Sequence, residues 1–286
     1  MNSFVAMNGE IVPLESLRIS PNNRGLMYGD GCFETIRSFS GNFLAFDAHI
    51  HRLHQSMLYL NLTSDIQKDD FYSIIQSLLQ VNNLAETDAI VRIQIWRRGG
   101  RGFVIDESSS DCLIQVIPVS ESKESVRLHV AKTPVIPNQA LRRSTKLSNG
   151  LNYILAGQEA VKHLADDAIL LTLDGFVSET TSSNIFWGNG DILCTPSTDC
   201  DLLHGITRNL LIKAIRRSRT IELEESSYRL EHLLDADYVF VTNAVQGLIP
   251  VSDIDGTFFS VSNQNFLTIK KQWELMKNNI LQNESA

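Results

Sequence analysis

Hydrophobic and polar residues alternate with a period of two in a stretch near the start of the chain, CFETIRSF. If this stretch forms a strand, Phe33, Thr35 and Arg37 lie on one of its faces. The turn sequence SGN and the apolar run FLAF follow directly. We therefore expect a β-hairpin in this part of the chain.

The period changes to that of a helix in the next two segments. Ile50, Leu53, Met57 and Leu60 lie at the spacing of one helix face, and Asp47 stands where an N-cap would. The segment DDFYSIIQSLLQVNNL has the same kind of amphipathic pattern. Two helices are expected to follow the hairpin.

Strand and helix patterns go on alternating through the rest of the chain. The apolar stretches AIVRIQIW and DCLIQVIPV read as strands on either side of the loop RRGGRG. The polar segment SESKES resembles a linker, and beyond it come a helix at 151–163, a helix that opens at Gly205 and a late strand, DYVFVTNAV. The alternation predicts an α/β (α+β) fold with a small α/β domain at 1–118, a linker at 119–125 and a larger domain at 126–286.

Composition and charge restrict the class of protein. With 286 residues, 43% hydrophobic and 20% charged, the chain can bury a core and is expected to be globular. A net charge of -8 without a basic run argues against nucleic acid as a partner. No apolar run is long enough to span a membrane. The four cysteines form no CxxC pair and no signal peptide precedes them, so we expect a reduced, cytoplasmic protein.

The stretch ETTSSNIFWGNGDILCTP places one carboxylate, Glu179, beside four small hydroxyl residues. No basic residue stands between 177 and 196, so this carboxylate needs a positive partner from elsewhere in the fold or from a ligand. Further on, Gly205 and Thr207 open an amphipathic helix whose first N–H groups have no partner within the helix. That helix start is either an anion site or an ordinary cap.

Arg52 lies off the apolar face of its predicted helix, among His49, His51 and His54. A solvated arginine would occupy the same kind of position, so the pattern leaves its role open. The three histidines have no Cys, Asp or Glu nearby at ligand spacing, and no metal site is expected.

Lys146 is the lysine with the least ordinary surroundings. It stands in STKLSNGLNYILAG, before an apolar helix, and its nearest charges are Arg142 and Arg143. Neighbouring cations and partial burial favour the neutral amine that imine formation requires. Lys132 is the competing candidate, and the local context favours Lys146.

Several of these features coincide in one known signature. Glu179-x-Thr181-x-x-Asn184-Ile185-Phe186, then Leu193-x-Thr195, then Leu203-x-Gly205-Ile206-Thr207-Arg208 closely resemble the signature of class IV (fold type IV) pyridoxal-phosphate aminotransferases. The resemblance extends from RGLMYGDGCFETIR through Lys146 to TNAVQGLIPV. It implies a small N-terminal α/β domain, a larger C-terminal pseudo-barrel domain that binds pyridoxal 5'-phosphate, and a homodimer.

The resemblance also implies roles for individual residues. Glu179 would pair with the pyridine nitrogen of the cofactor, and Lys146 would form the Schiff base. Arg52 and the helix start at Ile206 and Thr207 would share the phosphate, so that one dianion accounts for two features that are weak separately. The remaining cofactor contacts are expected from Asn243 and Ala244 on the late strand.

The substrate is expected to be a small amino-carboxylate. Phe33 and Thr35 would line its pocket from one strand face. The loop RRGGRG carries Arg97, Arg98 and Arg101, which form either a solvated turn or a clamp on a substrate carboxylate. By resemblance, Arg101 is the preferred carboxylate ligand.

The family implies two reactions. Branched-chain and D-amino acid aminotransferases and 4-amino-4-deoxychorismate lyase all form the external aldimine and remove the Cα proton, but only the lyase expels pyruvate and leaves 4-aminobenzoate. RRGGRGF, NIFW and TNAVQGLIP resemble lyase segments, and Gly150 and Ala244 depart from the aminotransferase pattern. FETIR and GITR are common in aminotransferases, which stay the alternative. A protein that binds the cofactor without turnover is a remote third possibility.

Overall fold

The computed structural model describes residues 3–219 and 221–284, with the backbone alone for 283 and 284. The contacts divide the chain into two compact units. Unit 1 comprises Met1–Ser120, Thr145–Gly150 and Ile280–Ala286, and unit 2 comprises Glu121–Ser144 and Leu151–Asn279. The predicted domain bounds, 1–118 and 126–286 with a linker at 119–125, stay a prediction. Residues 1–2 and 285–286 of those ranges lie outside the described residues.

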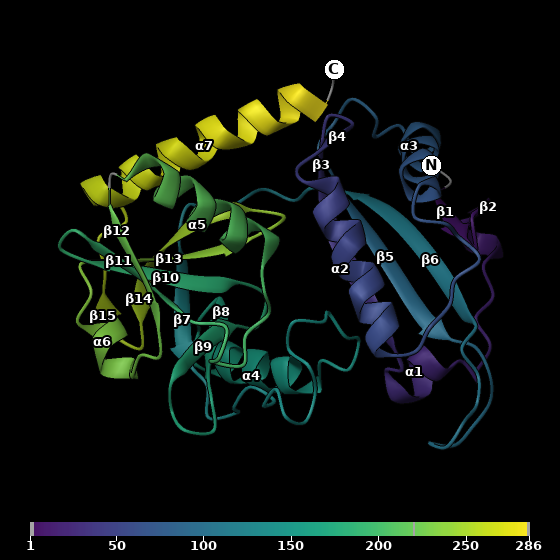
Figure 1. Cartoon of the computed structure of the whole chain (residues 1–286), viewed down its shortest axis with the longest axis horizontal. Coiled ribbons are helices and arrows are strands. Elements are labelled where there is room, and N and C mark those ends of the chain that lie inside the picture. The colour runs from purple at the N-terminus through teal and green to yellow at the C-terminus, as the bar shows by residue number, and fades with distance from the viewer. Residues whose placement is uncertain (1–2, 220, 285–286) are drawn as a thin grey trace. The chain divides into compact units, whose positions relative to one another are not determined.

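Unit 1 is built on a six-stranded sheet (Figure 1). In order across the sheet, the strands are β2 (Glu10–Pro13), β1 (Phe4–Met7), β6 (Ser110–Pro118), β5 (Ala89–Arg97), β3 (Gly31–Phe39) and β4 (Asn42–Phe43). All five pairings between them are antiparallel. The helical segments of the same region are the 3-10 helix η1 (Leu14–Ser16), α1 (Arg24–Tyr28), α2 (Phe46–Tyr59) and α3 (Asp70–Val81).

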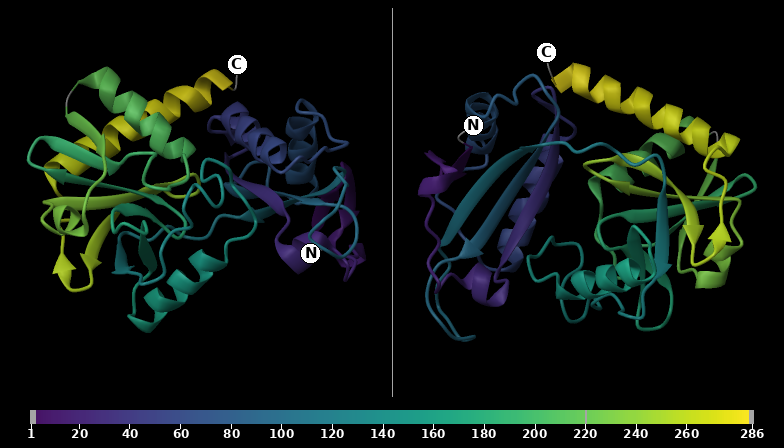
Figure 2. Two further views of the ribbon diagram at one scale, coloured as in Figure 1. Left: turned by 60° about the horizontal axis from the view of Figure 1, so that its bottom comes forward. Right: turned by 180° about the vertical axis from the view of Figure 1, so that it is seen from behind.

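The core of unit 1 lies between this sheet and the helices α2 and α3 (Figure 2). Ile50, Leu53 and Met57 of α2 are buried against it, as their helical spacing predicts. The helix begins earlier than expected: Asp47 lies in its first turn, and the N-cap is Ala45. The expected N-cap at Asp47 is therefore wrong.

The strand β3 has the two faces that its alternating sequence predicts. Its even-numbered residues from Cys32 to Ser38 are buried towards the helices, whereas Phe33, Thr35 and Arg37 are half-buried on the other face. The strand enters the sheet at Gly31, where a Cβ would lie 2.2 Å from the carbonyl oxygen of Ile95. Only glycine lets the two backbones approach this closely.

Unit 2 is built on a nine-stranded mixed sheet. Its main path is β12 (Glu222–Ser226), β11 (Ile192–Pro196), β10 (Asn184–Asn189), β13 (Tyr238–Asn243), β14 (Gly247–Ile254), β7 (Val126–Val130), β8 (Asp167–Leu171) and β9 (Val177–Thr180), with β15 (Thr257–Phe258) paired to β14. The remaining helices are α4 (Leu151–Lys162), α5 (Ile206–Ser218), α6 (Leu230–Leu234) and α7 (Gln264–Glu284).

This sheet curls into a half-barrel, because β9 at one end of the path also contacts β10 and β11 near the other end. Strand β10 is buried on both faces. Trp187 packs into the main core of the unit, while Phe186 stacks on Phe240 at a centroid distance of 5.2 Å. These contacts explain the two aromatic residues of NIFW as core residues.

The expected α/β (α+β) class is confirmed. The N-terminal hairpin of β1 and β2 and the long helix α7 were not expected. Within the described residues, no helix combines the length and the apolar character that a membrane span needs.

Candidate active site

Lys146 belongs to unit 1, where its backbone is fixed between α2 and β3. Its N–H donates to Ser56 Oγ at 3.0 Å, and its carbonyl accepts from the Phe33 N–H at 3.0 Å. An isolated bridge between Leu147 and Cys32 continues the contact with β3. The Lys146 Nζ lies 4.7 Å from the centroid of the Phe33 ring. The competing Lys132 belongs to unit 2 and is exposed.

An arginine that the sequence did not single out lies against the same ring. The Arg92 Cζ is 3.5 Å from the Phe33 centroid, and Arg92 Nη1 donates to Thr35 Oγ1 at 3.0 Å. Burial lowers the pKa of Arg92 to about 10, against an opposing effect of Glu34, so the guanidinium stays charged at neutral pH. The available signal was a charged residue inside the predicted strand AIVRIQIW. In the structure Arg92 pairs with Thr35 in the register of β5 and β3.

Arg52 points from α2 to a buried carboxylate on β3. Its Nε lies 2.6 Å from Glu34 Oε1 and its Nη2 lies 2.9 Å from Glu34 Oε2. His49 Nδ1 contacts the same carboxylate at 3.0 Å. Sequence reasoning missed Glu34, although a carboxylate at a buried position of an alternating strand was a signal. Among the described residues, no group of three or more His, Cys, Asp or Glu side chains is arranged to bind a metal.

The arginines of the loop RRGGRG have different surroundings. Arg97 Nε donates to Asp30 at 3.0 Å, and its terminal nitrogens donate to the backbone carbonyls of three residues. Arg98 Nε donates to Asp111 at 2.8 Å. Both guanidinium groups therefore brace unit 1 itself. Arg101 is exposed in the loop. The predicted substrate roles of Arg97 and Arg101 stay predictions.

In unit 2, Glu179 lies at the end of β9 and is 4% exposed. Tyr153 Oη donates to its Oε1 at 2.6 Å, and the Leu203 N–H donates to its Oε2 at 2.9 Å. Asn184 Nδ2 and Arg143 Nη2 approach the carboxylate at 3.4 and 3.5 Å. Side chain and backbone donors from several elements thus fix the orientation of this carboxylate.

The hydroxyl residues after Glu179 have a structural task. Thr180, Thr181 and Ser182 each contact the carboxylate of Asp167 through their hydroxyl groups, at 2.8, 2.5 and 3.2 Å. Because Asp167 starts β8, these bonds tie the turn between β9 and β10 to the neighbouring strand. The small hydroxyl side chains therefore hold Glu179 at the end of its strand.

The start of α5 has the features of an anion site. Its N-cap is Gly205, and no side chain caps the helix. A Cβ at Gly205 would lie 2.0 Å from Asn184 Oδ1, so a larger residue would force the Asn184 side chain to move. No acidic residue occupies the first turn, and Thr207 is buried there. The N–H groups of Ile206 and Thr207 and the helix dipole favour a negative ligand.

Asn243 holds the turn between β13 and β14. Its Oδ1 accepts from the N–H groups of Val245 and Gln246 at 3.0 and 2.8 Å, and its Nδ2 donates to Ser183 Oγ at 3.0 Å. Ala244 lies within this turn. The contacts of Asn243 and Ala244 with a cofactor stay predictions.

Unit 1 contains an amine and an arginine, and unit 2 contains an oriented buried carboxylate and an uncapped helix start. Each is a kind of group that suits the chemistry of pyridoxal phosphate. The sequence profile described as "Amino-transferase class IV" matches residues 31–254. The chain belongs to the class IV aminotransferase family. It is an enzyme of this pyridoxal-phosphate-dependent family.

Two curated relatives of this class IV chain have different activities in their names. A putative branched-chain-amino-acid aminotransferase of Methanocaldococcus jannaschii is 32% identical over 257 residues, which cover 88% of each chain. An aminodeoxychorismate lyase of Bacillus subtilis is 31% identical over 259 residues, which cover 88% of this chain and 87% of the relative. The two identities differ too little to separate the two reactions.

Solved structures support the fold type. The branched-chain aminotransferase of Thermoproteus uzoniensis with norvaline has a TM-score of 0.89 and 25% identity, and covers 98% of this chain and 95% of its own. The Escherichia coli branched-chain aminotransferase has a TM-score of 0.87 and 25% identity, with coverages of 95% and 93%. The expected fold type IV is confirmed.

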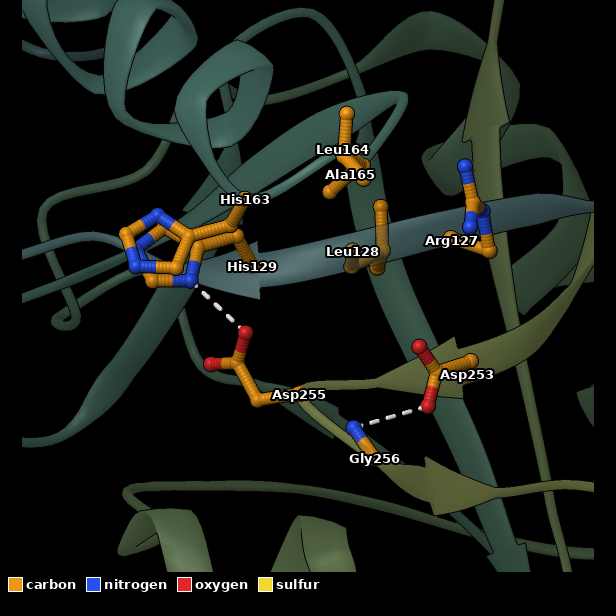
Figure 3. Close-up of a pocket in the computed structure, with 9 residues that line it drawn as sticks. All are labelled: Arg127, Leu128, His129, His163, Leu164, Ala165, Asp253, Asp255 and Gly256. Carbon is orange, nitrogen blue, oxygen red and sulfur yellow. Dashed lines mark hydrogen bonds and ion pairs between the residues drawn. The ribbon is translucent and has the colours of Figure 1, made fainter.

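A pocket in unit 2 contains none of the predicted site residues (Figure 3). The rings of His129 and His163 stack there at a centroid distance of 3.8 Å, and His129 Nδ1 contacts Asp255 at 2.7 Å. Arg127 and Asp253 line its other side. Opposite charges on its walls favour no single class of ligand.

Proposed function

We propose that the cofactor is attached through Lys146 Nζ, with Glu179 at the ring nitrogen and Arg52 and the α5 start at the phosphate. When bound, pyridoxal phosphate supplies an electron-accepting ring that stabilises negative charge on the substrate carbon. The fixed orientation of Glu179 supports its role, because a carboxylate against the ring nitrogen favours the protonated ring. Borohydride reduction and peptide mapping should find the cofactor on Lys146, and label on Lys132 would contradict this.

Lys146 is also the proposed base. Its amine lies beside the Phe33 ring, and the hydrogen bonds of its backbone fix the origin of the side chain on both sides. An amine placed in this way accepts the proton from the substrate carbon and returns it at a later step.

The substrate is proposed to meet Phe33, Thr35 and Arg92. A guanidinium at 3.5 Å from a phenyl ring offers a charged and an aromatic surface side by side. This combination suits a planar or cyclic substrate that carries a carboxylate. The bond from Arg92 to Thr35 Oγ1 fixes the guanidinium on the sheet, so the carboxylate would be bound at a set position.

We propose 4-amino-4-deoxychorismate lyase activity on this basis, and the pair of Arg92 and Phe33 is the observation that carries it. Lys146 takes the proton from the ring carbon that bears the amine. The bond between the neighbouring carbon and the enolpyruvyl oxygen then breaks, and the enol leaves and takes up a proton as pyruvate. The ring becomes aromatic as 4-aminobenzoate, so atoms and electrons balance without an oxidant.

An amino-acid aminotransferase of the branched-chain or D-amino acid type is the second candidate. The relative from Methanocaldococcus jannaschii, named as a branched-chain enzyme at 32% identity, favours it. In this reaction Lys146 would return the proton to the cofactor side, and 2-oxoglutarate would accept the amino group. Arg92 would then bind a carboxylate of the amino or oxo acid.

One pair of assays separates the candidates. Aminodeoxychorismate should yield equal amounts of 4-aminobenzoate and pyruvate, whereas L- or D-amino acids with 2-oxoglutarate should yield little glutamate. Glutamate formation without 4-aminobenzoate would overturn the lyase proposal in favour of the aminotransferase. No product from either mixture, with cofactor bound, would support the remote alternative of a protein that binds the cofactor without turnover.

Two further proposals concern the state of the protein. We propose a homodimer, as the family resemblance implies, and light scattering should give twice the chain mass of 32.1 kDa. We also propose a cytoplasmic location. The free, buried thiols of Cys32, Cys112, Cys194 and Cys200 support it, since reducing compartments preserve such thiols.

A further inference from the structure

Glu34 is a carboxylate in the core of unit 1. Its side chain is 0% exposed, and it stands on the face of β3 whose other members pack against the helices. A charged group at such a place costs free energy unless partners compensate it. The partners of Glu34 therefore have to explain why a carboxylate occupies this position.

The main partner is Arg52, and the pairing is two-pronged. Its Nε and Nη2 meet the two carboxylate oxygens separately, at 2.6 and 2.9 Å. Two parallel bonds of this kind fix the plane of a guanidinium as well as its position. The edge of the guanidinium that carries Nη1 is consequently held at a set orientation relative to β3.

His49 supports the same carboxylate from one turn earlier on α2. Its Nδ1 lies 3.0 Å from Glu34 Oε2, and the side chain is buried. Burial holds the pKa of His49 below its usual range. Burial alone would raise the pKa of the Glu34 carboxyl, but Arg52 and His49 outweigh it and hold that pKa far below the usual range of a glutamate. At neutral pH Glu34 is therefore ionised, and the neutral His49 donates from Nδ1.

The position of Arg52 is linked to that of Lys146 by one hydroxyl group. Ser56, one turn after Arg52 on α2, donates to the Arg52 carbonyl at 2.9 Å and accepts the Lys146 N–H at 3.0 Å. On the other side, Glu34 and Phe33 are neighbours on β3, and Phe33 donates to the Lys146 carbonyl. Strand β3 and helix α2 thus fix the arginine and the lysine together.

We infer that Glu34 and His49 are positioning residues that orient the Arg52 guanidinium for the phosphate of the cofactor. This inference rests on the proposed function, in which Arg52 binds that phosphate. Glu34 and His49 set the phosphate affinity through Arg52 and touch neither substrate nor cofactor. A carboxylate with a purely structural role would support the fold but would not change the recognition of the phosphate in particular.

The test compares two probes that differ only in the phosphate: pyridoxamine 5'-phosphate and pyridoxamine, titrated calorimetrically into the full chain freed of cofactor. Neither probe has an aldehyde, so Lys146 does not react with it. We define the probe ratio as the dissociation constant of pyridoxamine divided by that of pyridoxamine 5'-phosphate. This ratio measures phosphate recognition alone. In Glu34→Gln we expect this ratio to fall by roughly 10-fold, comparable with losing an outer hydrogen-bond partner at a metal site, while pyridoxamine affinity stays within about twofold.

The matched control is Asp88→Asn. Asp88 pairs with Arg37 at 2.6 Å, and Arg37 lies on the same strand as Glu34, three residues further on. This change also removes a carboxylate from an arginine of unit 1, but it should leave the probe ratio at its wild-type value. A fall in the ratio of the control equal to that of Glu34→Gln would overturn the inference.

His49 gives a second route if Glu34→Gln does not fold. His49→Leu removes the donor to Glu34 and should lower the probe ratio by a few-fold. His49→Asn places an amide N–H near the position of Nδ1 and should restore most of the ratio. Equal losses in both variants, or a loss for pyridoxamine as large as for its phosphate, would show that His49 and Glu34 only support the fold.

Failure of the proposed function has its own signature. The double variant Glu34→Gln, Arg52→Met removes both charges and should reduce the ratio further than Glu34→Gln alone. If the double variant keeps the wild-type ratio, Arg52 does not bind the phosphate, and the proposed function and this inference both fall. If only Glu34→Gln keeps the wild-type ratio, Arg52 binds the phosphate without help, and this inference alone falls.

Discussion

Glu34 in unit 1 and Glu179 in unit 2 are both buried carboxylates on strands, yet their partners differ. Glu34 meets a two-pronged arginine with contacts of 2.6 and 2.9 Å. The short bonds to Glu179, 2.6 and 2.9 Å, come from the neutral donors Tyr153 and Leu203, and Arg143 stands at 3.5 Å. Similar burial is thus combined with two different kinds of support.

The difference indicates what each carboxylate is for. A carboxylate paired closely with arginine has its charge compensated and fixes the position of that arginine. Neutral donors fix the direction of a carboxylate but leave its negative charge in place. Such a group is suited to attract a proton on a ligand ring. The difference therefore supports the positioning task proposed for Glu34 and the electronic task proposed for Glu179.

The largest expected effect concerns the charge pair of unit 1. Arg52→Ala leaves the Glu34 charge in the core without its main partner, which should lower the free energy of unfolding by about 3–5 kcal/mol. Arg143→Ala leaves Glu179 with its neutral donors and should cost at most about 1.5 kcal/mol. Urea unfolding of the cofactor-free variants measures both. Equal losses of unfolding free energy would show that Glu34 and Glu179 depend on their arginines to the same extent.

The next effect concerns the chemistry. Glu179→Gln keeps the size of the side chain but removes its charge, so the ring nitrogen would lose the group proposed to keep it protonated. Removal of the substrate proton should slow by about 10²-fold, or roughly 2.7 kcal/mol, while the cofactor still binds. Single-turnover exchange of deuterium at the reacting carbon tests this. Exchange at the wild-type rate with full occupancy would remove the electronic task from Glu179.

Much of the local structure could be predicted from the sequence. The period of β3 gave the correct faces for Phe33 and Thr35, because alternation depends on neighbouring residues alone. The α5 start at Gly205 was visible for the same reason. In both places the physical cause, side-chain direction or an uncapped helix end, lies within a few residues.

The partners of the site residues could not be predicted in this way. Tyr153 reaches Glu179 over 26 residues, and Ser56 reaches the Lys146 backbone over 90. Such bonds depend on how the strands and helices pack, and no local period encodes them. Lys146 belongs to unit 1 although the residues on both sides of its short segment belong to unit 2, which local sequence patterns do not reveal.

A smaller effect is expected for Tyr153, which tests the support of Glu179 by neutral donors. Tyr153→Phe removes the bond of 2.6 Å to Oε1 and keeps the ring. Loss of one such bond, about 1 kcal/mol, should slow proton removal by roughly 5-fold, well below the effect of removing the charge. The same deuterium exchange measures it. A loss as large as that of Glu179→Gln would mean that orientation and charge cannot be separated at this carboxylate.

The last expected effect is a change of stability with pH that arises from His49. Burial lowers the pKa of His49 in the folded chain, so below its usual pKa the unfolded chain binds a proton that the folded chain resists. Stability is therefore lost as the pH falls from 7.5 to 5.5, with a slope of at most about 1.4 kcal/mol per pH unit for this one proton. His49→Asn has no such proton and should lose less stability over this range.

Thermal midpoints at both pH values provide the measurement, and His54→Asn is the control, because His54 is less buried and its own lowered pKa should matter less. Parallel loss in wild type and His49→Asn would show that the histidine beside Glu34 is not held neutral by the fold, and the support of Arg52 would then come from a charged cluster with two cations.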